Sequence, residues 1–130
     1  MTWELILDGY SESSYSATPR FAAARLPWFN VITHPAALNE LIELPDNLRG
    51  RMARLIERLE QEGNKMKMPH SRVIGGGLFE LRVGDKNIAR TLYAYATGNE
   101  IYLLHAFVKK TQKTPTKAIE IARMRLKEMK

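Results

Sequence analysis

The sequence contains no cysteine among its 130 residues. Disulfide bonds, thiolate catalysis and cysteine-ligated zinc are therefore excluded, and the composition is compatible with a reducing compartment. No apolar run approaches the roughly 20 residues that a membrane-spanning helix needs. The N-terminus also lacks the basic and then apolar pattern of a signal peptide. We therefore expect a cytoplasmic protein.

The motifs of several familiar ligand sites are also missing. The glycine run at 75–77 has neither the spacing of a dinucleotide-binding fingerprint nor that of a P-loop, and it is expected to be a flexible turn. The three histidines, His34, His70 and His105, fall in different predicted elements, with no pair at metal-ligand spacing. We therefore expect neither a metal nor a cofactor.

Positive charge is present, and it is concentrated at one end of the chain. The formal net charge is +6. From His105 to Lys130 there are eight basic and two acidic residues, whereas residues 1–104 carry twelve of each. The C-terminal segment therefore holds the whole net charge, which predicts a polyanion or an acidic protein surface as its partner.

Hydrophobic patterning and turn signals predict a single α+β domain over residues 28–130. Residues 1–27 form an N-terminal extension that could be an extra strand followed by a loop. The predicted elements are a strand at 28–33, helices at 35–44 and 46–62, a loop at 64–77, strands at 78–83, 88–96 and 101–108, and a final helix with Thr114 as N-cap and Pro115 as its first residue. The expected packing is an antiparallel sheet of four to five strands, with two N-terminal helices packed on it and a C-terminal helix.

Basic and aromatic side chains gather around the last three predicted strands, and lysines cluster where the last strand ends. The set comprises Arg82, Arg90, Tyr93, His105, Lys109, Lys110 and Lys113. Positive charge beside aromatic rings suits single-stranded nucleic acid, through phosphate contacts and base stacking, for which Tyr93 is a candidate. The same groups could promote cleavage, because RNA carries its own 2′-hydroxyl nucleophile and needs orientation and charge neutralisation. A basic face that is merely solvated remains the alternative.

Three segments carry a family resemblance: Leu81-Arg82, residues 89–95 (ARTLYAY) and residues 104–115 (LHAFVKKTQKTP). Together they resemble the RelE-like toxins of type II toxin–antitoxin modules, and most closely the phage-derived branch related to HigB. The resemblance covers roughly residues 28–130, and its most specific part begins at His105. It implies one toxin domain with the small RelE-like fold, which agrees with the predicted order of elements.

The resemblance also implies an activity and a set of partners. The implied activity is that of an endoribonuclease that cleaves mRNA on translating ribosomes and inhibits translation. The implied partner is a cognate helix-turn-helix antitoxin, in a toxin–antitoxin hetero-oligomer. Arg90 is implied as the arginine that stabilises the transition state, and Lys109 and Lys110 match the basic pair at the strand end. RNA contacts are implied for Arg82, Lys113, Lys65 and Lys67.

Two points stay open at the level of sequence. Some relatives carry a tyrosine shortly after the final basic cluster, where this chain has Thr114-Pro115. The general base could therefore be Lys109, Lys110 or His105, and His105 could equally be a packed core histidine. A non-catalytic binder or inhibitor on the same scaffold, acting as a gyrase poison or as a nucleic-acid-binding protein, is the alternative function.

Overall fold

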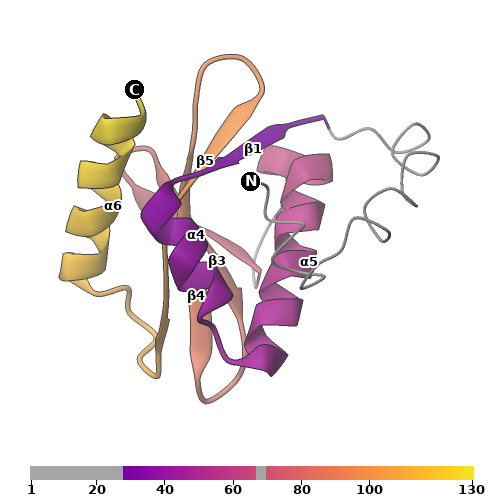
Figure 1. The fold of residues 1–130 in the computed structure, drawn as a ribbon, viewed down its shortest axis with the longest axis vertical. Helices are drawn as coiled ribbons and strands as arrows, with labels where there is room; N and C mark the ends of the chain where they lie inside the picture. The colour runs from indigo at the N-terminus through magenta and orange to yellow at the C-terminus, as the bar shows by residue number, and fades with distance from the viewer. Residues whose placement is uncertain (1–27, 67–69) are drawn as a thin grey trace.

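The computed structural model describes residues 28–66 and 70–130, and it places a five-stranded sheet at the centre of the molecule (Figure 1). The strands lie in the order β1-β5-β4-β3-β2. Their bounds are β1 Asn30–Thr33, β2 Ser71–Gly75, β3 Leu78–Val83, β4 Ile88–Tyr95 and β5 Glu100–Lys109. The strand and loop predicted within residues 1–27 lie outside the described residues, as does Lys67.

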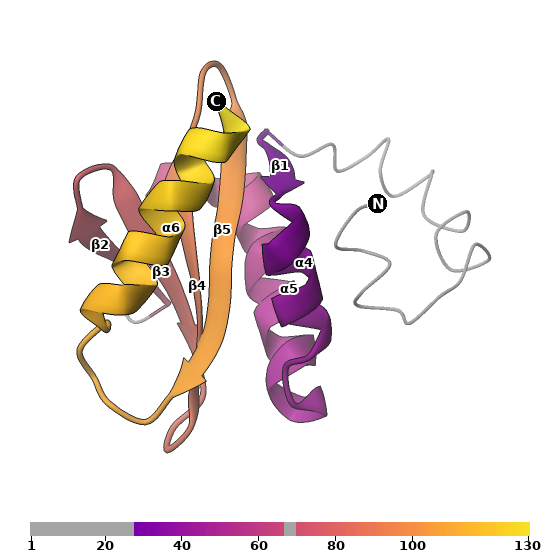
Figure 2. The same ribbon diagram turned by 60° about the vertical axis from the view of Figure 1, so that its left-hand side comes forward.

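Three α-helices accompany the sheet, and the two longer ones cover opposite faces (Figures 1 and 2). They are α4 Pro35–Ile42, α5 Asp46–Glu62 and α6 Thr116–Met129. Helix α5 packs against β3 and β4, α6 packs against β5 and β4, and α4 lies along β5. Pro35 starts α4, where its missing N–H costs nothing. Gly63, at φ 53°, ends α5 and leads into a 3₁₀ turn at Gly63–Lys65.

The two faces of the sheet hold two separate apolar cores. The larger core joins the leucines of α4 and α5 to one face, including Leu81, Tyr93 and Leu103. The smaller core lies under α6 and contains Leu78, Leu92, Leu104, Ala118 and Ala122. Because successive strand residues point to opposite faces, Glu80, Arg82 and Arg90 share the face of Leu78 and Leu92. The fold therefore directs these charged side chains toward the α6 side of the sheet.

The sheet is mixed, which corrects the prediction of an antiparallel sheet. Strands β2 to β5 pair antiparallel, whereas β1 pairs parallel to β5, with Asn30 opposite Glu100 and Thr33 opposite Leu103. Strand β1 leads into α4 rather than into a neighbouring strand, so its direction is not constrained by a hairpin. Beyond Leu103, no strand within residues 28–66 and 70–130 pairs with β5 on that side.

Two further predictions about local structure were wrong. The predicted loop at 64–77 contains β2, an edge strand whose Val73 is 74% exposed, so it lacks the alternating apolar pattern that marks a half-buried strand. Thr114 does not cap the final helix, because α6 begins at Thr116 and the N-cap is Pro115. The Thr114 hydroxyl bonds to a strand residue instead.

None of the helices within residues 28–66 and 70–130 combines the length and the apolar content needed to cross a membrane.

Candidate nucleic-acid interface

A row of polar side chains crosses the α6 side of the sheet below the apolar core of α6. Arg82 on β3 lies opposite Arg90 on β4, and Arg90 lies opposite Phe107 on β5. Glu80 precedes Arg82 by two residues and therefore lies on the same face. Gly84 follows β3 at φ 110° and turns the chain back into β4, so the two arginines come from adjacent strands of one hairpin. Local strand geometry alone thus brings a carboxylate and two guanidinium groups together.

These buried groups hold the segment that joins β5 to α6, residues 109–115, which we call the lysine loop; Lys109 is also the last residue of β5. The Arg82 Nε donates to Glu80 Oε1 at 2.5 Å, and the Thr114 hydroxyl donates to Glu80 Oε2 at 2.7 Å. Arg82 also donates to the side-chain oxygen of Gln112 at 3.2 Å and to its carbonyl. Arg90 Nη1 donates to the carbonyl of Lys113 at 3.1 Å.

We call Glu80, Arg82, Arg90, Gln112 and Thr114 the loop anchor. It fixes the loop backbone from beneath.

The loop anchor carries more positive than negative charge, and its central side chains are buried. Glu80 and Arg90 are both 0% exposed. Burial, with the nearby Arg82, lowers the pKa of Arg90, and Glu80 opposes that shift. The Nε and Nη2 atoms of Arg90 have no hydrogen-bond partner among the residues that the structure describes. Arg90 therefore keeps unused donors beneath the loop, a costly arrangement unless another acceptor can reach them.

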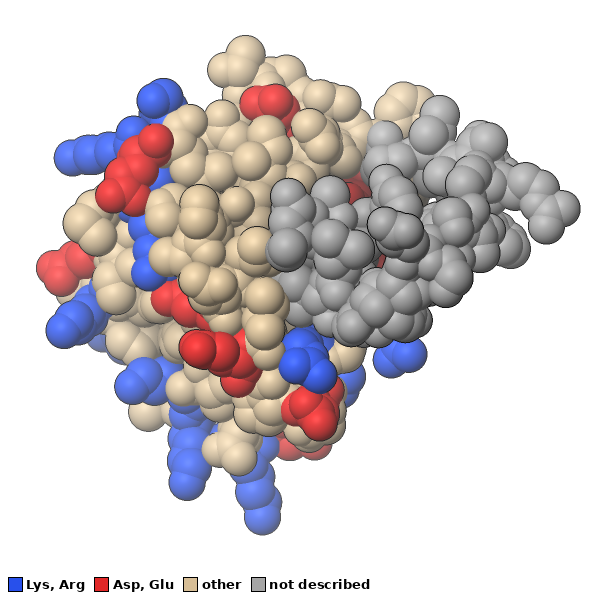
Figure 3. Space-filling model, viewed as in Figure 1, with Lys and Arg blue, Asp and Glu red and all other residues tan. Residues whose placement is uncertain are grey.

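Above the anchor, the lysine side chains are exposed. Lys109, Lys110 and Lys113 all face solvent, as does Lys86 in the turn between β3 and β4. Lys109 pairs with Ile88 in the sheet, which brings that turn beside the end of β5. Figure 3 shows Lys and Arg side chains projecting at the lower end of the molecule, where Figure 1 places this end of the sheet. The exposed ammonium groups suit a phosphate backbone rather than a single buried anion.

A groove adjoins this surface. It has a volume of about 400 Å³ and lies between the start of α5, the β3–β4 turn and the end of β5. Its lining residues are Pro45, Asn47, Leu48, Arg51, Gly84, Asp85, Lys86, Asn87 and Val108. Leu48 and Val108 belong to the core on the α5 side of the sheet, so the groove opens on the face opposite to Arg90, and Lys86 is its link to the exposed lysines.

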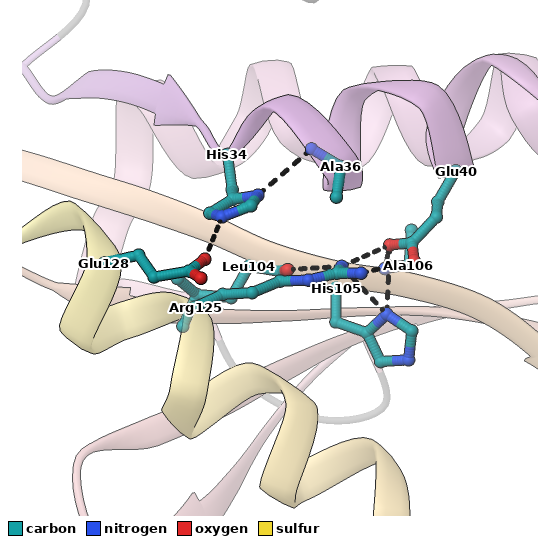
Figure 4. Close-up of polar contacts among 8 residues, drawn as sticks. All are labelled: His34, Ala36, Glu40, Leu104, His105, Ala106, Arg125 and Glu128. Carbon is teal, nitrogen blue, oxygen red and sulfur yellow. Dashed lines mark hydrogen bonds and ion pairs between the residues drawn. The ribbon is translucent and has the colours of Figure 1, made fainter.

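A second polar cluster lies at the edge of β5, where β1 has ended (Figure 4). Glu40 of α4 receives two hydrogen bonds from Arg125 of α6, at 2.8 and 3.0 Å, and one from the Ala106 N–H at 3.0 Å. The same carboxylate lies 2.9 Å from His105 Nδ1, and Arg125 donates to the Leu104 carbonyl at 3.0 Å. We call Glu40, His105 and Arg125 the edge clamp.

The edge clamp is balanced in charge and holds Glu40 ionised. Burial alone would raise the pKa of Glu40, but hydrogen bonds from His105, Arg125 and the Ala106 N–H lower it to about 2. The edge clamp also supplies side-chain hydrogen bonds to backbone groups at the edge of β5. The pairing of β4 with β5 slips between Leu92 and Tyr93. Arg125 binds the Leu104 carbonyl and Glu40 binds the Ala106 N–H, two backbone groups of β5 beyond the end of its pairing with β1.

The predicted site residues separate into those that the structure brings together and those that it does not. Arg82, Arg90, Lys109, Lys110 and Lys113 meet at the lysine loop. His105 is on the same side of the sheet, since its ring stacks on Phe107 at 4.9 Å, and Phe107 lies opposite Arg90.

Two predicted RNA contacts lie elsewhere. Tyr93 is 0% exposed, and its hydroxyl bonds to Ser71 at 2.9 Å in the core on the α5 side, so it cannot stack on a base. Lys65 follows α5, whereas the groove lies at the first turn of that helix. A 17-residue helix is about 25 Å long, so Lys65 is distant from the lysine loop.

Sequence reasoning missed five residues that shape these clusters. They are Glu80, Gln112 and Thr114 in the loop anchor, and Glu40 and Arg125 in the edge clamp. A signal existed for Glu80, because a charged residue at an alternate position of a strand beside an arginine predicts a buried pair. No comparable signal existed for Glu40, which reads as an ordinary polar position of an amphipathic helix.

The comparison with protein families gives one match. Residues 39–127, about two thirds of the chain, match the model described as phage derived protein Gp49-like (DUF891). No curated protein matches the chain. The matched range includes both clusters and the whole lysine loop. The family is one associated with toxins of the RelE and HigB type. The chain therefore belongs to the phage-derived Gp49-like family.

Proposed function

We propose that this chain is the toxin of a type II toxin–antitoxin module and that it cleaves mRNA on translating ribosomes. The observation that carries the proposal is the lysine loop, which presents exposed Lys109, Lys110 and Lys113 and is held from below by buried arginines. Family membership supports the toxin assignment. A cognate helix-turn-helix antitoxin would neutralise the protein in a hetero-oligomer.

The proposed reaction needs no metal. The 2′-hydroxyl of the RNA gives up its proton to a base and attacks the adjacent phosphorus, and the 5′-oxygen of the next nucleotide leaves with a proton. The products are a 2′,3′-cyclic phosphate and a 5′-hydroxyl. The exposed lysines would neutralise the flanking phosphates, which favours the dianionic transition state over the ground state. The ribosome would present the message in an extended form that fits the loop.

Arg90 would bind the RNA through the donors that have no partner among the residues that the structure describes. In the structure its Nη1 donates to the Lys113 carbonyl, while Nε and Nη2 are unpaired within the described residues. A phosphate oxygen accepts charge-assisted hydrogen bonds more strongly than a carbonyl does. We propose that RNA binding displaces the Lys113 carbonyl, so that the guanidinium binds the scissile phosphate through its planar fork.

The test is a pair of triple variants with the same change in charge. One variant, K109A/K110A/K113A, removes the lysines of the loop. The matched control, K117A/K127A/K130A, removes two exposed lysines from α6 and the exposed lysine that follows it. Each gene is briefly induced in a bacterial host, and growth, ribosome-associated transcripts and the chemistry of RNA 5′ ends are measured.

The proposal expects growth arrest and new 5′-hydroxyl ends with the parent and with the α6 control. The loop variant should lose both, at equal amounts of folded protein. Equal activity of the two variants would show that the loop does not bind the message. Growth arrest with damaged DNA and intact transcripts would replace the proposal with the second candidate, a gyrase poison on the same scaffold.

A further inference from the structure

Glu40 is held in one position by an unusual number of contacts for a helix side chain. Arg125 binds both of its oxygens, and the Ala106 N–H binds Oε1 (Figure 4). Only about a quarter of the Glu40 side chain is exposed. A carboxylate fixed by donors from both α6 and β5 has little freedom to turn away from His105.

These contacts determine which nitrogen of His105 carries the hydrogen. An ionised carboxylate only accepts hydrogen bonds, and Glu40 Oε1 is 2.9 Å from His105 Nδ1. Arg125 Nη1 is 3.3 Å from the same nitrogen, but its two hydrogens point to Glu40 and to the Leu104 carbonyl at shorter distances. Nδ1 therefore donates to Glu40, and in the neutral ring Nε2 keeps a free lone pair.

That lone pair faces away from the edge clamp. Figure 4 shows the far side of the His105 ring turned from both Glu40 and Arg125. Nε2 has no hydrogen-bond partner within residues 28–66 and 70–130, and it is not among their buried unsatisfied atoms. The ring itself is held by stacking on Phe107, with an interplanar angle of 26°.

His105 also shares a face of the sheet with the arginine of the proposed site, on the neighbouring strand. Arg90 and Phe107 are direct neighbours across β4 and β5, and His105 is two residues from Phe107 on the same face. Diagonal neighbours of this kind are about 7–8 Å apart at their Cα atoms. A phosphate bound by Arg90 and the preceding ribose could therefore occupy the space between the two side chains.

We infer that Glu40 is a positioning residue that orients His105 so that Nε2 accepts the proton of the 2′-hydroxyl. The inference rests on the proposed function, and it commits to one of the three possible bases. When Nε2 takes the proton, the oxygen attacks phosphorus and the ring becomes an imidazolium. The charged groups facing that ring are Glu40 from α4, which stabilises it, and Arg125 from α6, which limits that stabilisation.

The chain contains a matched comparison for this pair. His34 Nε2 lies 2.7 Å from Glu128 of α6, and its Nδ1 accepts the N–H of Ala36 at the start of α4. Both nitrogens of His34 are thus used, and no lone pair is left for a substrate. Glu128→Gln is therefore the control for Glu40→Gln, because each variant neutralises one carboxylate that contacts a histidine ring nitrogen.

The first measurement is the pH dependence of cleavage of a defined mRNA by the purified full chain with ribosomes. E40Q should lower the rate at neutral pH about 10- to 100-fold and should move the acidic limb of the profile to lower pH, because the imidazolium loses its counter-charge. H105Q should lower the rate about 100-fold or more. E128Q should keep the parental profile. A parental profile for E40Q or an active H105Q would overturn the inference while leaving RNA cleavage intact.

The second measurement does not depend on activity. Nitrogen-15 NMR of the histidine rings in the folded parent should show the Nδ1–H form for His105 in its neutral state. The Nε2–H form would overturn the inference, even if E40Q folded too poorly to assay. If the parent protein cleaves no RNA, the proposed function fails, whereas the ring spectrum still reports whether Glu40 sets the tautomer.

Discussion

The loop anchor and the edge clamp are two buried charge clusters on one protein, and they differ in charge balance. The loop anchor opposes one carboxylate, Glu80, with two guanidinium groups, and two nitrogens of Arg90 stay unpaired within the described residues. The edge clamp opposes Glu40 with Arg125, and the oxygens of Glu40 accept four hydrogen bonds. Within the described residues, the loop anchor therefore has buried donors without a partner, whereas the edge clamp has no buried side-chain atom that lacks one.

The difference in charge balance indicates that buried charge has a different role in each cluster. A balanced, fully bonded pair can fix distant segments, since the edge clamp joins α4 to α6 across 85 residues of sequence. Surplus positive charge adds self-repulsion and desolvation cost, so it is not an economical way to fix a loop. Under the proposed function, this surplus serves as a preformed receptor for phosphate. Variants that alter the balance of each cluster should therefore have different effects.

The largest expected effect on folding comes from Glu80→Gln. The change leaves Arg82 and Arg90 buried without a counter-charge, so we expect a loss of about 3–5 kcal/mol in the free energy of unfolding. Urea denaturation at neutral pH measures it. The control is Glu62→Gln, which breaks the exposed pair with Arg58 and should cost under about 1 kcal/mol. Equal losses would mean that Glu80 does not neutralise the anchor.

The contribution of the edge clamp to stability should depend on pH. The pKa of Glu40 is lowered to about 2, below its unfolded value. Its contribution to stability is therefore complete above about pH 5 and disappears as the pH falls toward 2, with a total of about 3 kcal/mol. The difference in the free energy of unfolding between the parent and Glu40→Gln should therefore become smaller as the pH falls from about 5 toward 2. A difference that is constant with pH would indicate lost packing rather than lost charge.

The sequence was informative where a single element determines the structure. The bounds of α5 and β3 agree with the prediction, because Pro45, Gly63 and the alternation of Phe79, Leu81 and Val83 are local signals. Strand β2 escaped prediction, since an exposed edge strand does not alternate. The adjacency of Arg82 and Arg90 was predictable from the hairpin between them.

The remaining parts of the site depend on tertiary packing. The partner of Glu40 is 85 residues away, and the contact lies where the pairing of β1 with β5 ends at Thr33. The burial of Arg90 depends on the path of the lysine loop, which no local pattern determines. Helix, strand and charge patterns therefore identified the basic surface with Arg82 and Arg90, but not the other members of the loop anchor or the pair of Glu40 with Arg125.

A smaller effect is expected from Thr114→Val. The hydroxyl donates to Glu80 Oε2 in a buried setting, so its loss should cost about 1–2 kcal/mol in unfolding free energy. The loop should also become more mobile, which faster amide hydrogen exchange in residues 110–115 would report. Thr116→Val, at an exposed position two residues later, is the matched control and should change neither measurement. An unchanged exchange rate in Thr114→Val would show that Arg82 and Arg90 hold the loop without it.

The smallest effect is expected from Glu128→Gln, and it tests whether carboxylate–histidine pairs are equivalent. Glu128 is 56% exposed and binds one histidine nitrogen, so its neutralisation should cost about 0.5 kcal/mol or less at neutral pH. Urea denaturation of Glu40→Gln and Glu128→Gln under the same conditions gives the comparison. A similar cost for both would mean that the clamp adds nothing beyond an ordinary surface contact. A clearly larger cost for Glu40→Gln would instead show that the bonds to Arg125 and Ala106 make its carboxylate a fixed part of the fold, as the orientation of His105 requires.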